Sequence, residues 1–204
     1  MTDDIRNQPE GSTRLDDISG LLRDDITTRA ALDQAESLNV INAIEWTTRG
    51  KLKDVFTVSF YTKLHSMMFD QVWQWAGTMR SQTGTFANIG VAPALVPSEL
   101  GRVAMEFSRR WKERADASLL PFIAAYHHQL VWVHPFDNGN GRWARLACDT
   151  VAERLTKSPR IIWASEDLST PGDQRRGYIA ALRHADEGDP EPLVRYLAKL
   201  NPGR

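Results

Sequence analysis

The sequence predicts a single, mostly helical domain with one small hairpin. Apolar residues recur at helical spacing in several long segments, and stretches rich in glycine and proline separate these segments. One segment between two helical stretches has short alternating pieces and no helical stripe. At 204 residues, the chain is long enough for one domain that buries roughly 70% of its unfolded surface. It has no internal repeat and no low-complexity segment, so we expect one domain.

The N-terminal part is predicted to contain an arm and two helices. Residues 1–26 are polar and charged and should order only by docking, so we place the domain at 27–204. Residues 27–46, "TTRAALDQAESLNVINAIEW", begin with a hydroxyl N-cap candidate, Thr27 or Thr28. The expected buried stripe of this first helix is Leu32, Leu38, Ile41 and Ile44, and that of the second helix, in residues 54–73, is Phe56, Phe60, Leu64 and Met67.

The remaining segments continue this alternation. Residues 76–97, "AGTMRSQTGTFANIGVAPALVP", are predicted to form a loop or a short hairpin. A helix should follow in 98–115, and "FIAAYHHQLVWV", 122–133, is apolar on nearly every face, which predicts a central buried helix. Helices are also expected in 143–156, 176–186 and 192–200, with a turn-rich insert around 166–173.

Composition excludes several classes of protein. There are 25 basic and 26 acidic residues, with a net charge of −1, so the chain lacks the basic footprint of a nucleic-acid-binding protein. The only cysteine is Cys148, which rules out an internal disulfide and a cysteine-rich zinc site. The N-terminus lacks the apolar region of a signal peptide, and no apolar run is as long as a membrane span. We therefore expect a cytoplasmic protein that binds neither membrane nor nucleic acid.

The segment "HPFDNGNGRWAR", 134–145, contains the residues that we predict to be functional. Pro135 and the glycines should end one helix, and Asn140 can start the next, so the Gly-Asn-Gly amides would lie at a helix N-terminus, which favours an anion. Glycines at 139 and 141 let phosphate oxygens approach the backbone. Together these features suit a polyphosphate.

Charged and titratable side chains flank this predicted anion site. Arg142 and Arg145 are three residues apart, so on a helix they share a face and can reach the same anion. His134, at the other end of the loop, can accept a proton near neutral pH. We interpret His134 as a general base.

At this spacing the segment resembles the signature of the Fic/Doc family, H-x-F-x-[acidic]-G-N-G-R-x-x-R. Seven fixed letters match, and such a match arises by chance roughly once in a billion positions; they are His134, Phe136, Gly139, Asn140, Gly141, Arg142 and Arg145. "VWQWAGTMR", "NIGVAPALVP" and "GYIAALRHADEGDPEPLVRYL" also resemble Fic proteins, so the likeness covers about residues 27–200. Within the family the chain is most similar to the subgroup called mobile mystery protein B, associated with mobile elements and a helix-turn-helix partner.

The resemblance implies an all-α Fic fold, a helical bundle around a central helix-loop-helix motif with a short β-hairpin flap. The implied activity is transfer of AMP from ATP to a Ser, Thr or Tyr hydroxyl of a target protein, with Mg²⁺ or Mn²⁺ as the metal. By the same resemblance His134 deprotonates the hydroxyl and Phe136 anchors the loop in the core. Phosphates would be held by Gly139, Asn140, Gly141, Arg142 and Arg145. Residues 77–97 would be the flap that aligns the target as an added strand, the alternative being a plain surface connection. The implied partners are the target protein and a helix-turn-helix or antitoxin-like protein.

The chain departs from the family pattern at two places. Asn138 occupies the position of the acidic residue that helps to bind Mg²⁺; an amide offers an oxygen without charge, and Asp137 should point elsewhere. An inhibitory Ser/Thr-x-x-x-Glu-Gly/Asn segment, whose Glu pairs with the second motif arginine in many members, is matched by neither Glu36 nor Glu45, and we interpret both as ordinary helix-face carboxylates.

Other functions remain as alternatives. A Doc-like protein phosphotransferase is the first, although Doc-type motifs usually carry a lysine where Gly141 stands. A nucleotide-binding regulatory module without transfer activity is the second, and Asn138 favours it. A metal pair formed by His127 and His134, seven residues apart, is disfavoured because no third ligand is near and Pro135 ends the helix.

Overall fold

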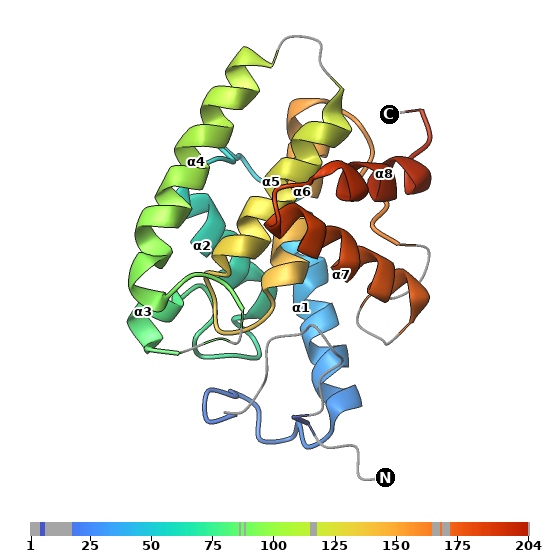
Figure 1. The fold of residues 1–204 in the computed structure, drawn as a ribbon. Helices are drawn as coiled ribbons and strands as arrows, with labels where there is room; N and C mark the ends of the chain where they lie inside the picture. Colours follow the sequence, from blue (N-terminus) through green and yellow to red (C-terminus); the bar gives the residue numbers. More distant parts are fainter. Residues whose placement is uncertain are drawn as a thin grey trace.

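The computed structural model describes residues 5–6, 18–85, 87, 89–114, 118–164, 168 and 172–203. Within this part of the chain there are eight α-helices and one 3₁₀ turn, and β-structure is limited to two isolated bridges (Figure 1). The helices are α1 (Arg29–Arg49), α2 (Val58–Phe69), α3 (Arg80–Thr83), α4 (Val96–Glu113), α5 (Leu119–Val133), α6 (Asn140–Leu155), α7 (Asp173–Asp186) and α8 (Glu191–Leu200), with the 3₁₀ turn at Pro93–Leu95. The prediction of an all-α fold is confirmed.

Helix α5 lies at the centre of the bundle. It packs against α4, α6, α7 and α8, so neighbours cover it on several sides (Figure 1). Its buried side chains come from nearly every face of the helix and include Leu120, Ile123, Tyr126, Leu130 and Val133. The long apolar run thus forms the buried central helix that the sequence predicts.

Helices α1 and α2 begin where hydroxyl side chains cap them. The Thr28 side chain accepts a hydrogen bond of 3.2 Å from the Ala31 N–H, and Thr57 accepts one of 3.1 Å from Phe60. Each cap satisfies an amide that the first turn of a helix leaves unpaired. Thr28, one of the two predicted caps, therefore sets the start of α1.

The buried face of α1 differs from the predicted stripe. Leu32 is buried as expected, but Leu38 and Ile41 are 59% and 53% exposed. The buried face instead includes the polar residues Glu36 and Asn39. Asn39 bonds the Met67 carbonyl at 2.9 Å and the Gln71 N–H at 2.8 Å, and these bonds turn this side of α1 toward α2. Ile44 packs against the core as expected, so the predicted stripe was wrong at Leu38 and Ile41, because it assigned inward positions to apolar residues only.

The described part of residues 1–26 docks on the segment after α2. The Leu22 N–H donates to the Val72 carbonyl at 2.9 Å, and the Gln74 N–H donates to the Gly20 carbonyl at 2.8 Å. Ile5 and Ile26 are buried in the core. This part of the arm is therefore ordered by docking, while a domain boundary at residue 27 stays a prediction.

The segment between α2 and α4 does not form the expected hairpin. In the described residues of 77–97, which exclude 86 and 88, α3 and the 3₁₀ turn are the regular elements, and no β-ladder joins two parts of the segment. The one bridge here pairs Met79 with Phe136 of the loop between α5 and α6. The segment therefore pairs with the loop between α5 and α6, whereas a hairpin would pair with itself.

No helix among those described is long and apolar enough to cross a membrane.

Candidate active site

The loop between α5 and α6 contains the predicted motif. Helix α5 ends at Val133, and His134 turns the chain with a left-handed backbone at φ 51° and ψ 61°. Helix α6 begins at Asn140, preceded by Gly139 at φ 74°. A left-handed backbone is strained for a residue with a Cβ, so the surroundings must hold His134 in it. The predicted helix-loop-helix is confirmed.

Phe136 anchors the middle of the loop. Its side chain is fully buried, stacked on the His65 ring at 3.8 Å between centroids and edge-on to Trp143 at 5.1 Å. The Asn140 side chain brackets the same residue, accepting from the Phe136 N–H at 2.9 Å and donating to its carbonyl at 2.7 Å. The Asn140 side chain therefore faces the loop interior, and only its backbone amide remains for the predicted phosphate contact.

A second brace, which the sequence analysis missed, is His65 of α2. Its Nδ1 accepts from the Gly77 N–H at 2.9 Å, so Nε2 carries the proton and donates to the Asn138 carbonyl at 3.0 Å. Burial lowers the pKa of His65 to about 3, which keeps the ring in this neutral form. The sequence indicates only that His65 lies on the buried face of a helix. It does not indicate that its hydrogen-bond partner, Asn138, is 73 residues away.

His134, the predicted base, is nearly covered. Burial, then the charge of Arg80, lower its pKa to about 3, while the Val131 backbone acts in the opposite direction. Gly90 lies directly on it: a Cβ at Gly90 would be only 2.3 Å from the His134 Cβ. The imidazole is therefore neutral at physiological pH, the form that can accept a proton.

The N-terminus of α6 is the predicted anion site. As at the start of any α-helix, the amides of the first turn, from Asn140 to Arg142, have no partner within the helix. A Cβ on Gly139 would lie 2.5 Å from the ring of Phe69, so the close packing of this turn requires glycine. Sixteen residues of helix follow, whose dipole favours an anion at this end.

The two motif arginines lie beside this N-terminus but have different partners. Arg142 forms an ion pair with Glu36 of α1 and stacks over the Phe69 ring, 4.9 Å from its centroid. The guanidinium of Arg145 lies near Gly141. Burial raises the pKa of the Tyr178 hydroxyl on α7, and the charge of Arg145 acts on that hydroxyl in the opposite direction. The structure therefore does not bring both arginines to one partner, and their joint hold on one anion stays a prediction.

Glu36 requires a correction. Its side chain is 4% exposed, and one carboxylate oxygen accepts from Trp73 Nε1 at 2.7 Å while the other pairs with Arg142. It is therefore a buried ion-pair partner of a motif residue, and the interpretation as an ordinary surface carboxylate was wrong. Glu45 does fit that interpretation, because it is 57% exposed and pairs with Arg49 one turn away.

The residues present offer a divalent ion only a weak site. The side-chain oxygen of Asn138 accepts from the Gly139 N–H at 2.7 Å. The Asp137 carboxylate accepts from the Thr83 hydroxyl at 2.8 Å, so it points toward α3. No group of three or more His, Cys, Asp or Glu side chains able to hold a metal occurs in the described residues, and His127 instead bonds the Tyr178 hydroxyl at 2.6 Å. Of the two loop residues, Asn138 offers a divalent ion a neutral oxygen only, and Asp137 is directed toward α3.

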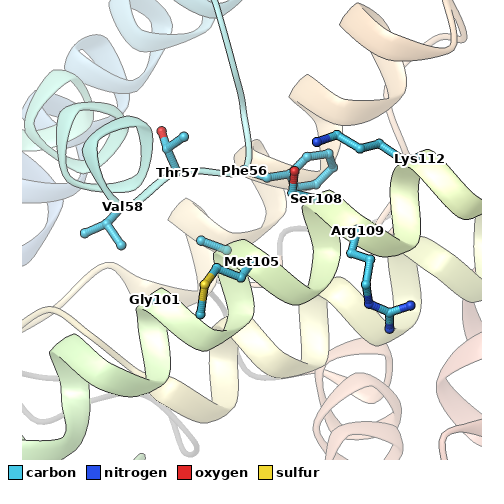
Figure 2. Close-up of a pocket in the computed structure, with 9 residues that line it drawn as sticks. Phe56, Thr57, Val58, Gly101, Met105, Ser108, Arg109 and Lys112 are labelled. Carbon is cyan, nitrogen blue, oxygen red and sulfur yellow. The ribbon is translucent and has the colours of Figure 1, made fainter.

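A cavity of about 560 Å³ lies elsewhere, between the start of α2 and α4 (Figure 2). Its lining includes Phe56, Val58, Met105 and Lys112 and no residue of 134–145. The cavity is therefore separate from the candidate active site.

Comparison with known proteins shows what this chain resembles. Residues 55–152 match the model of the Fic/DOC family, and this range includes α5, the whole loop and α6 as far as residue 152. This part of the chain is similar to a Fic/DOC family domain. It is similar to a protein adenylyltransferase Fic from Drosophila persimilis, with 38% identity over 104 residues that cover 50% of this chain and 19% of the relative. The chain thus spans less than a third of that relative's length.

Solved structures show the same fold. Fic-1 (residues 134–508) from C. elegans superimposes with a TM-score of 0.62 at 26% identity, covering 83% of this chain and 48% of that one. The N-terminal Fic domain of a Bep effector protein from Bartonella quintana, with bound ADP, gives a TM-score of 0.63 at 18% identity and covers 87% of each chain. The arrangement of helices around the loop is therefore the all-helical Fic fold.

Proposed function

We propose that this domain transfers AMP from ATP to a hydroxyl of a target protein. The observation that carries the proposal is the neutral, buried imidazole of His134, held at the turn that leads into the N-terminus of α6. The predicted anion site and the predicted proton acceptor thus lie at the two ends of one loop. The resemblance to protein adenylyltransferases supports nucleotide as the anion.

The reaction would need few groups. His134 takes the proton of the target hydroxyl, whose oxygen forms a bond to the α-phosphorus as the bond to the pyrophosphate oxygen breaks. The α6 amides, Arg142 and Arg145 neutralise the charge that moves onto the pyrophosphate. Phosphate charge near the loop would also raise the pKa of His134 above its value in the free protein, which strengthens the base. A bound Mg²⁺ would supply further charge neutralisation, with Asn138 and the phosphates as its ligands.

A binding module without transfer is the second candidate. Two observations favour it: Arg142 is engaged by Glu36, and Asn138 offers a metal no charge. If this candidate is correct, the loop binds a nucleotide, but no target hydroxyl is present for His134 to deprotonate.

Labelled ATP distinguishes the candidates. The protein is incubated with a cell lysate, Mg²⁺ or Mn²⁺, and ATP labelled at the α- or the γ-phosphate. Label from the α-phosphate on protein supports AMP transfer, label from the γ-phosphate indicates a Doc-like phosphotransferase, and nucleotide binding without label indicates the module.

Two histidine variants make this experiment specific. His134→Ala should reduce transfer by about 100- to 10,000-fold, the usual cost of removing a general base, and should change ATP affinity little. His128→Ala is the matched control, since His128 lies on α5, the helix that leads into His134, and pairs with Asp186 on α7, and it should transfer normally. Retention of half the wild-type rate by His134→Ala would refute the role of the base.

A further inference from the structure

We propose that Arg80 is the positioning residue of the base: it fixes the backbone of His134 and couples it to the segment that covers it. The inference rests on the proposed function for its catalytic consequence. Arg80 is the first residue of α3. It precedes His134, the first residue of the motif 134–145, by 54 residues in the sequence. Its side chain is 1% exposed, so its contacts are with protein groups.

Among the described residues, the hydrogen bonds of the Arg80 side chain run to backbone carbonyls. Nε donates to the His134 carbonyl at 2.6 Å, and Nη2 donates to the Val91 carbonyl at 2.6 Å and, more weakly, to the Val133 carbonyl at 3.4 Å. The Arg80 backbone N–H donates to the Pro135 carbonyl at 2.8 Å. One residue therefore binds three consecutive carbonyls at the end of α5, together with a fourth carbonyl from the segment before α4.

Burying the Arg80 cation in this way costs folding stability, so stability alone does not explain an arginine at this position. Burial lowers the pKa of Arg80, and the charge of Asp137 acts in the opposite direction, although within the described part of the chain no carboxylate lies within ion-pair distance of the guanidinium. A buried cation without a carboxylate in direct contact is expensive, and an apolar side chain of similar size would usually fill such a site at less cost. The carbonyls at the C-terminus of α5 offset part of the cost, because a helix end is negative there. The planar guanidinium can bind several carbonyls at once, which a lysine ammonium on a flexible stem cannot do in this geometry.

The bonds act on the two peptide groups that follow the base. His134 has a left-handed backbone, and the carbonyls of His134 and Pro135 are both held by Arg80. Fixing these carbonyls fixes the direction of the His134 Cα–Cβ bond and hence the point from which its ring extends. A displacement of about 1 Å at a catalytic group can cost about 100-fold in rate, so this hold has a kinetic consequence.

The fourth carbonyl links the base to the segment of residues 77–97. Val91 follows Gly90, whose absent Cβ would be 2.3 Å from the His134 Cβ and 3.1 Å from Nη2 of Arg80. Segment and base therefore touch at the same point where the guanidinium binds both. If this segment aligns a target hydroxyl, Arg80 would determine the position of that hydroxyl relative to the His134 imidazole, because Arg80 binds both the segment and the base.

The test compares Arg80→Met and Arg80→Lys with the wild type. We expect Arg80→Met to lower kcat about 100-fold, with ATP affinity within twofold, because the α6 amides and arginines are untouched. Arg80→Lys, which restores charge and one donor, should recover about tenfold of that loss. Arg102→Met is the control: it removes a partly buried arginine network on α4, with Glu99, Glu106 and Gln129, and should leave kcat unchanged.

A readout without activity separates this inference from the proposed function. With labelled histidine, the NMR ring resonances of His134 should shift in both Arg80 variants, while those of exposed His184 stay in place. Such a shift, with ATP affinity retained, supports the positioning role even if the wild type transfers nothing. The inference is overturned if the His134 resonances do not move in Arg80→Lys, if kcat of Arg80→Met stays within threefold of the wild type, or if its ATP affinity falls as much as its rate. If Arg80→Met does not fold, the Arg80→Lys spectrum decides alone.

Discussion

Neutralising Glu36 should increase the affinity for ATP. In the free protein Arg142 is bound by the Glu36 carboxylate, which is 4% exposed, whereas the arginine is 31% exposed. A nucleotide phosphate that uses Arg142 must displace this carboxylate. Glu36→Gln removes the charge but keeps an oxygen for Trp73 Nε1, now at 2.7 Å, so the local packing is preserved.

The magnitude follows from the interaction removed. A hydrogen bond to a charged group contributes about 1.5 to 3 kcal/mol, and each 1.4 kcal/mol changes a dissociation constant about tenfold. If the whole contact competes with ATP, Glu36→Gln should lower Kd by about 10- to 100-fold. Arg142 is not stranded by the change, because it remains partly exposed and stacked over Phe69.

Calorimetry with ATP on the wild type and two variants decides this prediction. The matched control is Glu45→Gln, since Glu45 lies on the same helix and its ion pair with Arg49 is exposed. The control should bind ATP as the wild type does. Equal dissociation constants for Glu36→Gln and wild type would refute the reasoning and would mean that ATP does not use Arg142.

Three further predictions concern the loop and its surroundings. Gly139→Ala should lower the free energy of unfolding by about 1 to 3 kcal/mol in urea titrations, because φ is 74° and the new Cβ would be 2.5 Å from an aromatic ring of α2. Asn138→Glu should lower the Mg²⁺ concentration for half-maximal transfer and strengthen Mg²⁺-dependent ATP binding, with metal-free ATP affinity little changed. Lowering the pH from 6.5 to 5 should cost stability by about 2 kcal/mol for each of His65 and His134, since the unfolded state takes up protons that the folded state, with pKa values of about 3, does not. Asp149, whose pKa burial raises to about 6, acts in the opposite direction and offsets part of this loss.

Each of these has its own control. Gly188→Ala, at φ 94° with open space around it, should cost less than Gly139→Ala, and equal costs would mean that the aromatic contact is unimportant. Unchanged Mg²⁺ midpoints would place Asn138 away from the ion. Stability should be flat between pH 7 and 8 and fall below 6.5; a rise in stability over the acid range would show that the two histidines are protonated in the folded protein.

The helix-loop-helix could be predicted from sequence because local chemistry determines it. A long apolar run, a proline and two glycines indicate from the sequence alone where α5 ends and α6 begins. The buried face of α1 could not be predicted in this way. Its inward positions include Glu36 and Asn39, whose partners lie on other helices, and a pattern of hydrophobicity counts such residues as outward-facing.

The braces of the loop were missed for a related reason. Arg80 and His65 bind backbone carbonyls and amides, and a backbone group has no sequence signature. The short helix α3 was likewise missed, since residues 77–97 have the composition of a hairpin. Met79 instead pairs with Phe136 of the loop, so a tertiary contact replaces the local pairing that composition favours.

The two motif arginines illustrate how far spacing alone can be used. Residues three apart share a helix face, but long side chains reach different neighbours. Arg142 binds a carboxylate on α1, whereas the charge of Arg145 acts on the Tyr178 hydroxyl of α7. A polyphosphate at the α6 N-terminus would gain Arg145 without breaking an ion pair, whereas it would gain Arg142 only by displacing Glu36. The affinity of the proposed site for an anion would therefore depend in part on α1, which lies outside the matched Fic/DOC residues 55–152.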